Sequence, residues 1–229
     1  MSLAPRPQGF FVTGTDTGVG KTRVAVALLT ALVQAGRRAV GMKPVAAGCE
    51  LRDGQLVNGD ALALLAAGNV AASYGEVNPY AFRPAIAPHV AARQAGVAID
   101  RARIDESRRR LALRADYVVV EGAGGWLVPL GPDATMADVA RDFAYPVILV
   151  VGMRLGCINH ALLTAQAIAA SGLELAGWVA NDAGPAMPER AASVTAIAER
   201  LAAPCVADAH FGGSVAALSG PLRRLAGRD

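Results

Sequence analysis

Short runs of apolar residues alternate along the chain with longer stretches in which apolar residues recur at helical spacing. Within the short runs, polar residues do not occupy every second position, which is typical of strands that are covered on both faces. The pattern therefore predicts a parallel sheet flanked by helices. The predicted strands are Phe10–Thr13, Ala39–Pro44, Tyr117–Val120, Val147–Val151 and Ala176–Ala180.

Helical patterns separate these strands. The alternation of strand and helix predicts one doubly wound α/β domain over residues 1–229, with a mainly parallel sheet and helices on both faces. Asn69–Ile99 has weak periodicity, so we expect a long irregular segment with a functional role. Pro221–Leu225, near the end, is expected to be a short frayed helix. The predicted helices are Gly20–Ala35, Asp60–Ala67, Asp105–Ala115, Met136–Phe143, His160–Ser171 and Pro188–Leu201.

A glycine-rich loop, GTDTGVGKT over residues 14–22, follows the first strand and opens the first helix. Its glycines let the backbone wrap an anion, and its amides and the helix N-terminus point at phosphates. Lys21 can reach the β- and γ-phosphates, and the Thr22 hydroxyl can coordinate Mg²⁺. Five residues separate Gly14 from Gly20, one more than in the usual pattern, yet strand, loop and helix coincide. The predicted ATP-binding residues here are Gly18, Val19, Gly20, Lys21, Thr22 and Arg23.

Charged residues end two further predicted strands. Lys43 ends the second strand, where a second cation near the γ-phosphate would neutralise charge that develops during phosphoryl transfer. Glu121 follows four apolar residues, which is the Walker B arrangement with Glu in place of Asp, and its carboxylate can bind Mg²⁺. The run that follows, Gly122, Ala123 and Gly124, lets backbone approach a ligand closely.

Three other polar positions are less decisive. Asp60 stands where a helix is expected to begin, and the local sequence favours a helix N-cap over a metal ligand. Asn181, followed by Asp182 after the fifth strand, can either hydrogen-bond an adenine edge or shape a turn. His160 is a lone histidine on a predicted helix, which is usually structural.

Composition narrows the class of protein. With 53% hydrophobic and 18% charged residues, disorder is excluded, and the net charge of +3 gives no basic block for a nucleic acid. We interpret the cluster Arg108–Arg110 as the solvated face of a helix. The three cysteines form no CxxC pair, so neither a disulfide framework nor a zinc site is indicated. The absence of a signal pattern and of a long apolar run predicts a soluble, cytoplasmic protein with no membrane partner.

Taken together, these motifs resemble the dethiobiotin synthetase family. The segments that carry the resemblance occur in the family's order and cover residues from about 10 to 182. The EGAGG run together with the long form of the P-loop is the most specific of them. The segments are GTDTGVGKT (14–22), KPVAAG (43–48), NGDALAL (58–64), NPYAF (78–82), Pro88-His89, EGAGGWLVP (121–129), LGCINH (155–160) and AGWVAND (176–182).

The resemblance implies an enzyme that uses ATP and Mg²⁺ to convert 7,8-diaminononanoate (diaminopelargonate) and CO₂ into dethiobiotin in biotin biosynthesis. One amine captures CO₂ as a carbamate, ATP phosphorylates the carbamate, and the second amine closes the ureido ring. It also implies a homodimer with the substrate site near the subunit interface.

Roles for individual residues follow from the resemblance. Lys43 would hold carbamate and γ-phosphate, and Lys21 and Thr17 would meet the transferring phosphoryl group. Metal ligands would be Thr22, Asp60 and Glu121, so that the resemblance reverses the local interpretation of Asp60. Asn181 and Asp182 would contact the nucleotide base. The substrate would contact Lys43, Ala47 and, from the other subunit, Gly156, Cys157 and Asn159, which precede or open a helix that can bind a carboxylate.

The chain departs from the family pattern at two places. Ala47 stands where the family often has a serine close to the diamine, so one hydrogen bond is lost or replaced. The segment Cys205–His210 stands in place of a G-E-I-P-like strand end near the adenine, which leaves the nucleotide preference open.

The main alternative is a regulatory P-loop ATPase of the partitioning or septum-positioning kind. Such proteins usually carry an extra lysine early in the loop, whereas this chain has Thr15 and Asp16 there. Two further alternatives are an ATP-dependent amide-forming domain, which would need an added glutaminase domain, and a nucleotide-binding module without catalytic activity.

Overall fold

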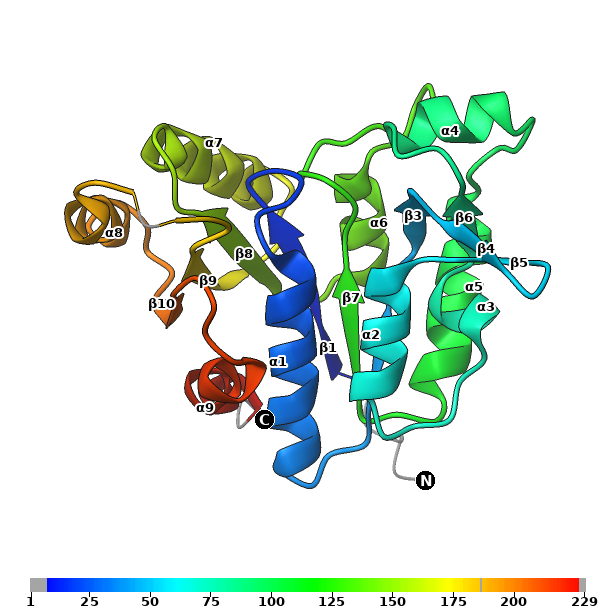
Figure 1. Ribbon diagram of the computed structural model, residues 1–229, viewed down its shortest axis with the longest axis horizontal. Coiled ribbons are helices and arrows are strands. Elements are labelled where there is room, and N and C mark those ends of the chain that lie inside the picture. The colour runs from blue at the N-terminus through cyan, green and yellow to red at the C-terminus, as the bar shows by residue number, and fades with distance from the viewer. Residues whose placement is uncertain (1–7, 186, 227–229) are drawn as a thin grey trace.

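The computed structural model describes residues 8–185 and 187–226; the amino-terminal residues 1–7 considered above lie outside this range. A central sheet runs through the molecule with helices on both faces (Figure 1). Its strands have the order β10-β9-β8-β1-β7-β2, and every neighbouring pair is parallel. They are β1 (Gln8–Gly14), β2 (Ala39–Met42), β7 (Tyr117–Glu121), β8 (Val147–Gly152), β9 (Leu175–Asn181) and β10 (Cys205–Ala209). The predicted doubly wound fold is confirmed.

Each central strand is buried on both faces, which explains why its sequence is continuously apolar. Along β1, Phe10 and Val12 pack with α1 (Lys21–Gln34), α2 (Gly59–Ala67) and α9 (Val215–Ala226) on one face. Phe11 points into the opposite layer, which contains α5 (Arg101–Ala112), α6 (Met136–Phe143), α7 (Cys157–Ala170) and α8 (Arg190–Ala198). The same division of adjacent residues between the two layers recurs in β7.

Sequence patterns placed the main helices correctly but missed several boundaries, one strand of the central sheet and the short strands β3 (Val45–Ala47), β4 (Glu50–Arg52), β5 (Gln55–Val57) and β6 (Tyr80–Phe82) outside it. Helix α5 begins four residues before the predicted Asp105, at Arg101, because Asp100 caps it by accepting from the Ala102 amide. Helix α7 begins at Cys157 rather than His160. Strand β10 was not predicted, because its segment CVADA mixes small and charged residues at the edge of the sheet.

The segment 69–99 contains regular structure and is not the long irregular segment that we predicted. It forms α3 (Tyr74–Val77), β6 (Tyr80–Phe82) and α4 (Pro88–Gln94). Strand β6 pairs in parallel with β3 (Val45–Ala47), next to a hairpin of β4 (Glu50–Arg52) and β5 (Gln55–Val57). Elements this short have no measurable sequence periodicity, which explains the wrong prediction.

The arginine cluster of α5 is only partly a solvated face. Arg109 and Arg110 are exposed and pair with acidic residues of the same helix. Arg108 is different, because only 15% of its side chain is exposed. Its guanidinium lies 5.2 Å from the Phe143 ring centroid and donates a hydrogen bond to the Tyr145 hydroxyl. Arg108 therefore anchors α5 to the α6–β8 connection, and the interpretation of the whole cluster as solvated was wrong for this residue.

The carboxyl-terminal helix α9 packs firmly against α1 and is not frayed as predicted. Leu218, Leu222 and Leu225 are buried in the layer that α1 forms. Their spacing of four and three residues places them on one face of the helix. Pro221 lies inside α9 without ending it.

Candidate active site

The phosphate loop connects β1 to α1 at the carboxyl edge of the sheet. Gly18 and Gly20 adopt positive φ angles of 74° and 92°, which side chains disfavour and glycine tolerates. Gly20 immediately precedes α1, so the amides of the first helical turn are free to face an anion. The buried Lys21 ammonium donates to the Asp16 carbonyl, 2.8 Å away. The predicted strand, loop and helix are confirmed.

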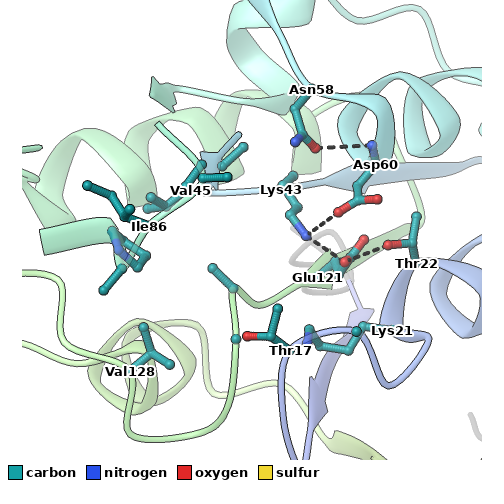
Figure 2. Close-up of a pocket in the computed structure, with 18 of the residues that line it drawn as sticks. Thr17, Lys21, Thr22, Lys43, Val45, Asn58, Asp60, Ile86, Glu121 and Val128 are labelled. Atoms are coloured by element: carbon teal, nitrogen blue, oxygen red, sulfur yellow. Dashed lines mark hydrogen bonds and ion pairs between the residues drawn. The ribbon is translucent and has the colours of Figure 1, made fainter. Parts of the chain in front are cut away.

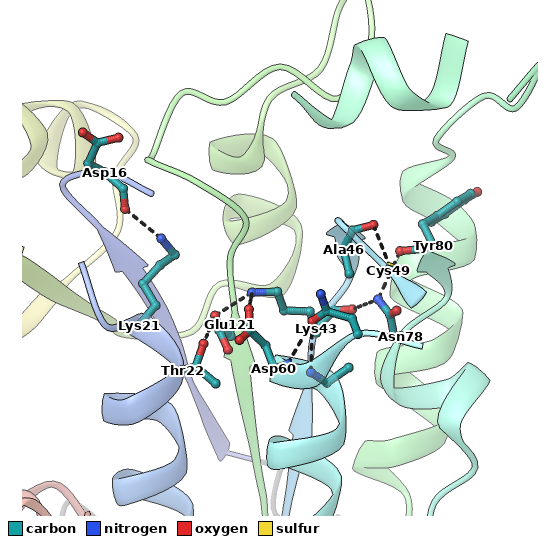
Figure 3. Close-up of polar contacts among 12 residues, drawn as sticks. Asp16, Lys21, Thr22, Lys43, Ala46, Cys49, Asp60, Asn78, Tyr80 and Glu121 are labelled. Atoms are coloured by element: carbon teal, nitrogen blue, oxygen red, sulfur yellow. Dashed lines mark hydrogen bonds and ion pairs between the residues drawn. The ribbon is translucent and has the colours of Figure 1, made fainter. Parts of the chain in front are cut away.

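Lys43 and Glu121 meet because of strand register. Strand β2 pairs with β7 so that Met42 lies opposite Val120, which places the next residues, Lys43 and Glu121, side by side at the sheet edge. The Lys43 ammonium lies 2.5 Å from Glu121 Oε1 and 3.0 Å from Asp60 Oδ2. The Thr22 hydroxyl donates to the same Glu121 oxygen over 2.9 Å (Figure 3).

The backbone of Lys43 is held by the end of α3 and the residue that follows it. Its amide donates to the Val77 carbonyl, and the Asn78 side-chain amide donates to its carbonyl over 2.7 Å. Asn78 is buried, and its oxygen accepts from the Tyr74 hydroxyl. These contacts fix the origin of the Lys43 side chain. The NPYAF motif indicated this segment, but not the positioning role of Asn78.

Asp60 is not the helix N-cap that the local sequence favoured. Asn58 caps α2, and its Oδ1 accepts from the amides of Asp60 and Ala61. Asp60 is the second residue of the helix, where a negative charge is stabilised by the helix dipole. Its side chain is free to turn toward Lys43, as Figure 2 shows.

Burial and charge act against each other at this cluster. Burial alone would lower the pKa of Lys43, but the carboxylates of Glu121 and Asp60 outweigh it, and the pKa of Lys43 is raised. Burial opposes ionisation of Asp60, yet the Lys43 ammonium holds the pKa of Asp60 below its ordinary value. Burial raises the pKa of Glu121 against the lowering effect of Lys43. The Lys43 ammonium therefore favours the ionised form of Glu121 against the effect of burial.

A cavity of about 670 Å³ joins the phosphate loop to this cluster (Figure 2). One part of its wall is polar and contains Thr17, Lys21, Thr22, Lys43, Asp60 and Glu121, with the backbone of Gly18, Gly20, Ala123 and Gly124. The opposite part is apolar, and sequence reasoning missed most of it: Val45, Ala46, Ile86, Pro88, Val128 and Pro129. Ala47 also lines the cavity. The cavity therefore combines a cationic phosphate site with an aliphatic wall.

Several predicted site residues lie elsewhere. Gly156, Cys157 and Asn159 line a separate cavity of about 400 Å³ at the N-terminus of α7. The side chain of Val19 is buried in the core, and the Gly122 amide donates to the Val12 carbonyl within the sheet. The structure therefore does not bring the first three residues to Lys43 within one chain.

Asn181 and Asp182 are both engaged by protein groups. The Asn181 side chain donates to the Val19 carbonyl over 2.8 Å and accepts from Arg23 over 3.0 Å. Asp182 pairs with Arg190 over 2.5 Å and approaches His210. In this structure Asn181 therefore stabilises the phosphate loop. The departing segment Cys205–His210 supplies β10 and His210 to the same corner.

The pKa of Lys21 predicts a pH dependence of nucleotide binding. Burial, followed by the positive charge of Lys43, lowers the pKa of Lys21 to about 8 from 10.5. We expect the ADP affinity of the free protein to fall as the pH rises through about 8, because neutral Lys21 no longer attracts phosphate. Between about pH 8 and pH 10.5, Lys21 binds fewer protons in the folded state than in the unfolded chain. The contribution of Lys21 to the free energy of unfolding therefore rises as the pH increases over this range.

Calorimetric titration with ADP across this pH range measures the effect. Lys21→Arg is the matched control, because a guanidinium stays protonated throughout. An ADP affinity that falls equally in both proteins would contradict the assignment to Lys21.

Comparisons with known proteins identify the family. A family model described as an AAA domain matches residues 8–208. The chain is 57% identical over 198 residues to "ATP-dependent dethiobiotin synthetase BioD" of Pseudomonas paraeruginosa. The aligned residues cover 86% of this chain and 87% of the relative. The equally named protein of Serratia marcescens is 53% identical over 192 residues, 84% of this chain and 85% of the relative. The chain belongs to the dethiobiotin synthetase family.

Solved structures place this dethiobiotin synthetase family member in the P-loop NTPase fold. The MinC:MinD cell division complex of Aquifex aeolicus matches with a TM-score of 0.62 at 17% identity, over 97% of both chains. A ParA family ATPase of Chlorobium tepidum matches with a TM-score of 0.59 at 12% identity, over 97% of this chain and all of that one. At these identities the likeness shows the fold alone, and it gives no support to a regulatory ATPase.

Proposed function

We propose that this protein is an ATP-dependent ligase that closes the ureido ring of dethiobiotin from 7,8-diaminononanoate and CO₂. The observation that carries the proposal is the position of Lys43, which lies 2.5 Å from Glu121 in the same cavity as the phosphate loop. A second ammonium group at this place can neutralise negative charge when an anionic acceptor attacks a phosphoryl group. The resemblance of the motifs to the dethiobiotin synthetase family implies that this acceptor is a carbamate.

The aliphatic wall of the cavity suits the carbon chain of the substrate. Val45, Ile86 and Val128 offer apolar contacts along one side, while the charged groups lie on the other. A diamine with a long methylene chain needs both environments. Ala47 offers no hydroxyl to the diamine, so binding at this position depends on packing.

The reaction proceeds in three steps. One substrate amine adds to CO₂ and loses a proton, which gives a carbamate. A carbamate oxygen attacks the γ-phosphorus of ATP as the bond to the β–γ bridging oxygen breaks, which gives a carbamic-phosphoric anhydride and ADP. The second amine then attacks the carbamoyl carbon, the bond from this carbon to the phosphate oxygen breaks, and the amine nitrogen loses a proton as phosphate leaves. Lys43 and Lys21 stabilise the charge on the transferring group, and Thr17 lies on the same wall of the cavity.

The residues at the sheet edge also fit a Mg²⁺ ion. Glu121 Oε2 is buried without a hydrogen-bond partner, next to the Thr22 hydroxyl and Asp60. These are hard oxygen donors, and Mg²⁺ in such sites takes few protein ligands and completes its shell with phosphates and water. Mg²⁺ would neutralise charge on the phosphates when bound. Among residues 8–185 and 187–226, no group of three or more His, Cys, Asp or Glu side chains is placed to hold a metal alone.

Product analysis tests the proposal. We expect the protein, given ATP, Mg²⁺, bicarbonate and 7,8-diaminononanoate, to form dethiobiotin detectable by mass, with ADP release that depends on the diamine. Rapid ATP hydrolysis without the diamine, and no dethiobiotin, would instead favour a regulatory ATPase. We place the reaction in the cytoplasm, where ATP is made and used. No helix among the described residues is long and apolar enough to cross a membrane.

A homodimer would complete the substrate site. The cavity of Gly156, Cys157 and Asn159 opens beside Leu155, which is 95% exposed, and beside Leu163. Helix α7 begins there, so its first amides can bind the substrate carboxylate. Because these residues do not line the Lys43 cavity of their own chain, a second copy would supply them. Leu155 and Leu163 line the same cavity, and exposed apolar residues that lie together in this way are typical of a protein interface.

Charge reversal on this surface tests the dimer. We expect Leu155→Glu combined with Leu163→Glu to yield a monomer in light scattering and to raise the KM for the diamine by at least about tenfold, because two buried charges oppose association. Leu113→Glu is the matched control, because Leu113 is also exposed but lies at the end of α5, away from this cavity, and the substitution should change neither quantity. A variant that stays dimeric with an unchanged KM would contradict the proposed interface.

A further inference from the structure

Lys43 occupies the place between the proposed metal ligands. Its ammonium lies 3.0 Å from Asp60 Oδ2 and 2.5 Å from Glu121 Oε1, the oxygen that also accepts from Thr22. Only 7% of the lysine side chain is exposed, so its ammonium is held beside the carboxylates by the surrounding protein. It is the counter-ion of both carboxylates.

A divalent cation and the Lys43 ammonium cannot both hold these positions. Mg²⁺ binds carboxylate and hydroxyl oxygens at about 2.0–2.1 Å, so an ion bound to Thr22, Asp60 and Glu121 would lie within contact distance of the ammonium. The two cations would repel each other strongly in a buried site. Binding of the metal through Glu121 Oε1 and Asp60 Oδ2, the two oxygens that Lys43 contacts, therefore requires Lys43 to withdraw.

The structure also provides a place to which Lys43 can withdraw. Hydrogen bonds to Val77 and Asn78 fix its backbone, while its side chain enters the cavity that also receives Lys21 and the phosphate loop. Rotation about the side-chain bonds would carry the ammonium toward the terminal phosphate without any movement of the sheet. Phosphate oxygens would replace the carboxylates as its counter-ions.

We propose that Lys43 is an exchangeable counter-ion that blocks the metal site until nucleotide phosphates draw its ammonium away. This proposal rests on the proposed function for the metal ligands and for the acceptor. It gives the catalytic lysine a second role as a positioning residue. Metal and nucleotide then bind cooperatively, and the same exchange that admits the metal delivers Lys43 to the reacting phosphoryl group.

Metal affinity without nucleotide tests the block directly. We expect Lys43→Met, in the absence of nucleotide at pH 7, where both lysines are protonated, to bind Mn²⁺ about tenfold more tightly than the wild-type protein, measured as free Mn²⁺ by electron paramagnetic resonance. Lys21→Met is the matched control, because it removes an equal charge whose ammonium contacts the Asp16 carbonyl instead. Equal tightening in both variants would indicate general repulsion and would overturn the exchange. Lys43→Gln replaces Lys43→Met if the latter does not fold.

The wild-type protein offers an independent measurement. Lys21 and Lys43 are the two lysines of the chain, so lysine labelled at Cε gives two side-chain NMR signals. We expect the Lys43 signal to stay unchanged when ADP is present only in trace amounts. We expect the same signal to shift when the protein is saturated with Mg²⁺ and ADP. A Lys43 signal that stays in place at saturation would mean that the metal binds through Glu121 Oε2 without displacement, and would overturn the proposal.

The two proposals fail in different ways. A protein that forms dethiobiotin but shows no gain of Mn²⁺ affinity in Lys43→Met refutes the exchange and leaves the function intact. A protein that shows the gain but forms no dethiobiotin refutes the function, while the competition between Lys43 and metal stands as a property of the site.

Discussion

Lys43→Ala is expected to lower kcat by about 10²–10³-fold, the effect of removing one preorganised electrostatic group from a transition state. The variant loses the ammonium that faces the acceptor and the phosphoryl group, while the phosphate loop keeps Lys21, Thr22 and its backbone amides. The Kd for ATP should therefore change by less than about threefold. Steady-state kinetics with the diamine and calorimetric titration of a non-hydrolysable ATP analogue measure the two quantities.

A control separates chemistry from folding. Lys43 is the partner of the buried Glu121, so the alanine variant must be compared with wild type by thermal unfolding. Lys43→Arg keeps the charge but carries a planar group in place of a compact one, and we expect it to recover only part of kcat. Turnover that is unchanged in Lys43→Ala would refute the role of Lys43 in catalysis, while the metal exchange is decided by the Mn²⁺ measurement.

The fold and the phosphate loop were predictable because their determinants are local. A continuous apolar strand followed by glycines, Lys21 and Thr22 specifies a strand, an anion-binding loop and a helix start within a short stretch of chain. Glu121 at the end of β7 was predictable for the same reason. Each of these positions depends on its neighbours in sequence. The uninterrupted apolar runs of the strands add the prediction that the sheet is parallel.

The relation between Lys43 and Glu121 depends on strand order, which sequence patterns do not contain. The two residues are 78 positions apart, and they touch because β2 pairs with β7 rather than directly with β1. The apolar wall was missed because Ile86 belongs to a connection between short elements that have no periodicity of their own. Asp60 was misread as a cap because Asn58, two residues earlier, competes for that role and wins it.

Gly20→Ala is expected to weaken ATP binding by at least about a hundredfold, through two effects that act at one atom. A Cβ at Gly20 would lie 2.2 Å from the Asn181 side-chain nitrogen, and the φ angle of 92° is strained for any residue with a side chain. Relief of the clash requires Asn181 to leave the Val19 carbonyl and Arg23, which removes the contact that holds the phosphate loop to β9. Strain and lost hydrogen bonds together cost about 2–4 kcal/mol.

Gly18→Ala is the matched control, because Gly18 has a similar φ of 74° but its Cβ would meet nothing within 4 Å. We expect this variant to show the strain alone, about 1–2 kcal/mol in the free energy of unfolding, with a loss of ATP affinity about tenfold smaller than that of Gly20→Ala. Calorimetric titration with ATP and denaturant unfolding measure the pair. Equal losses in both variants would mean that backbone strain explains the whole effect and that Asn181 does not brace the loop. A larger loss of ATP affinity in Gly20→Ala than in Gly18→Ala means that the hydrogen bonds of Asn181 hold the phosphate loop in its binding conformation. The end of β9 would then contribute to nucleotide binding through a contact within the protein.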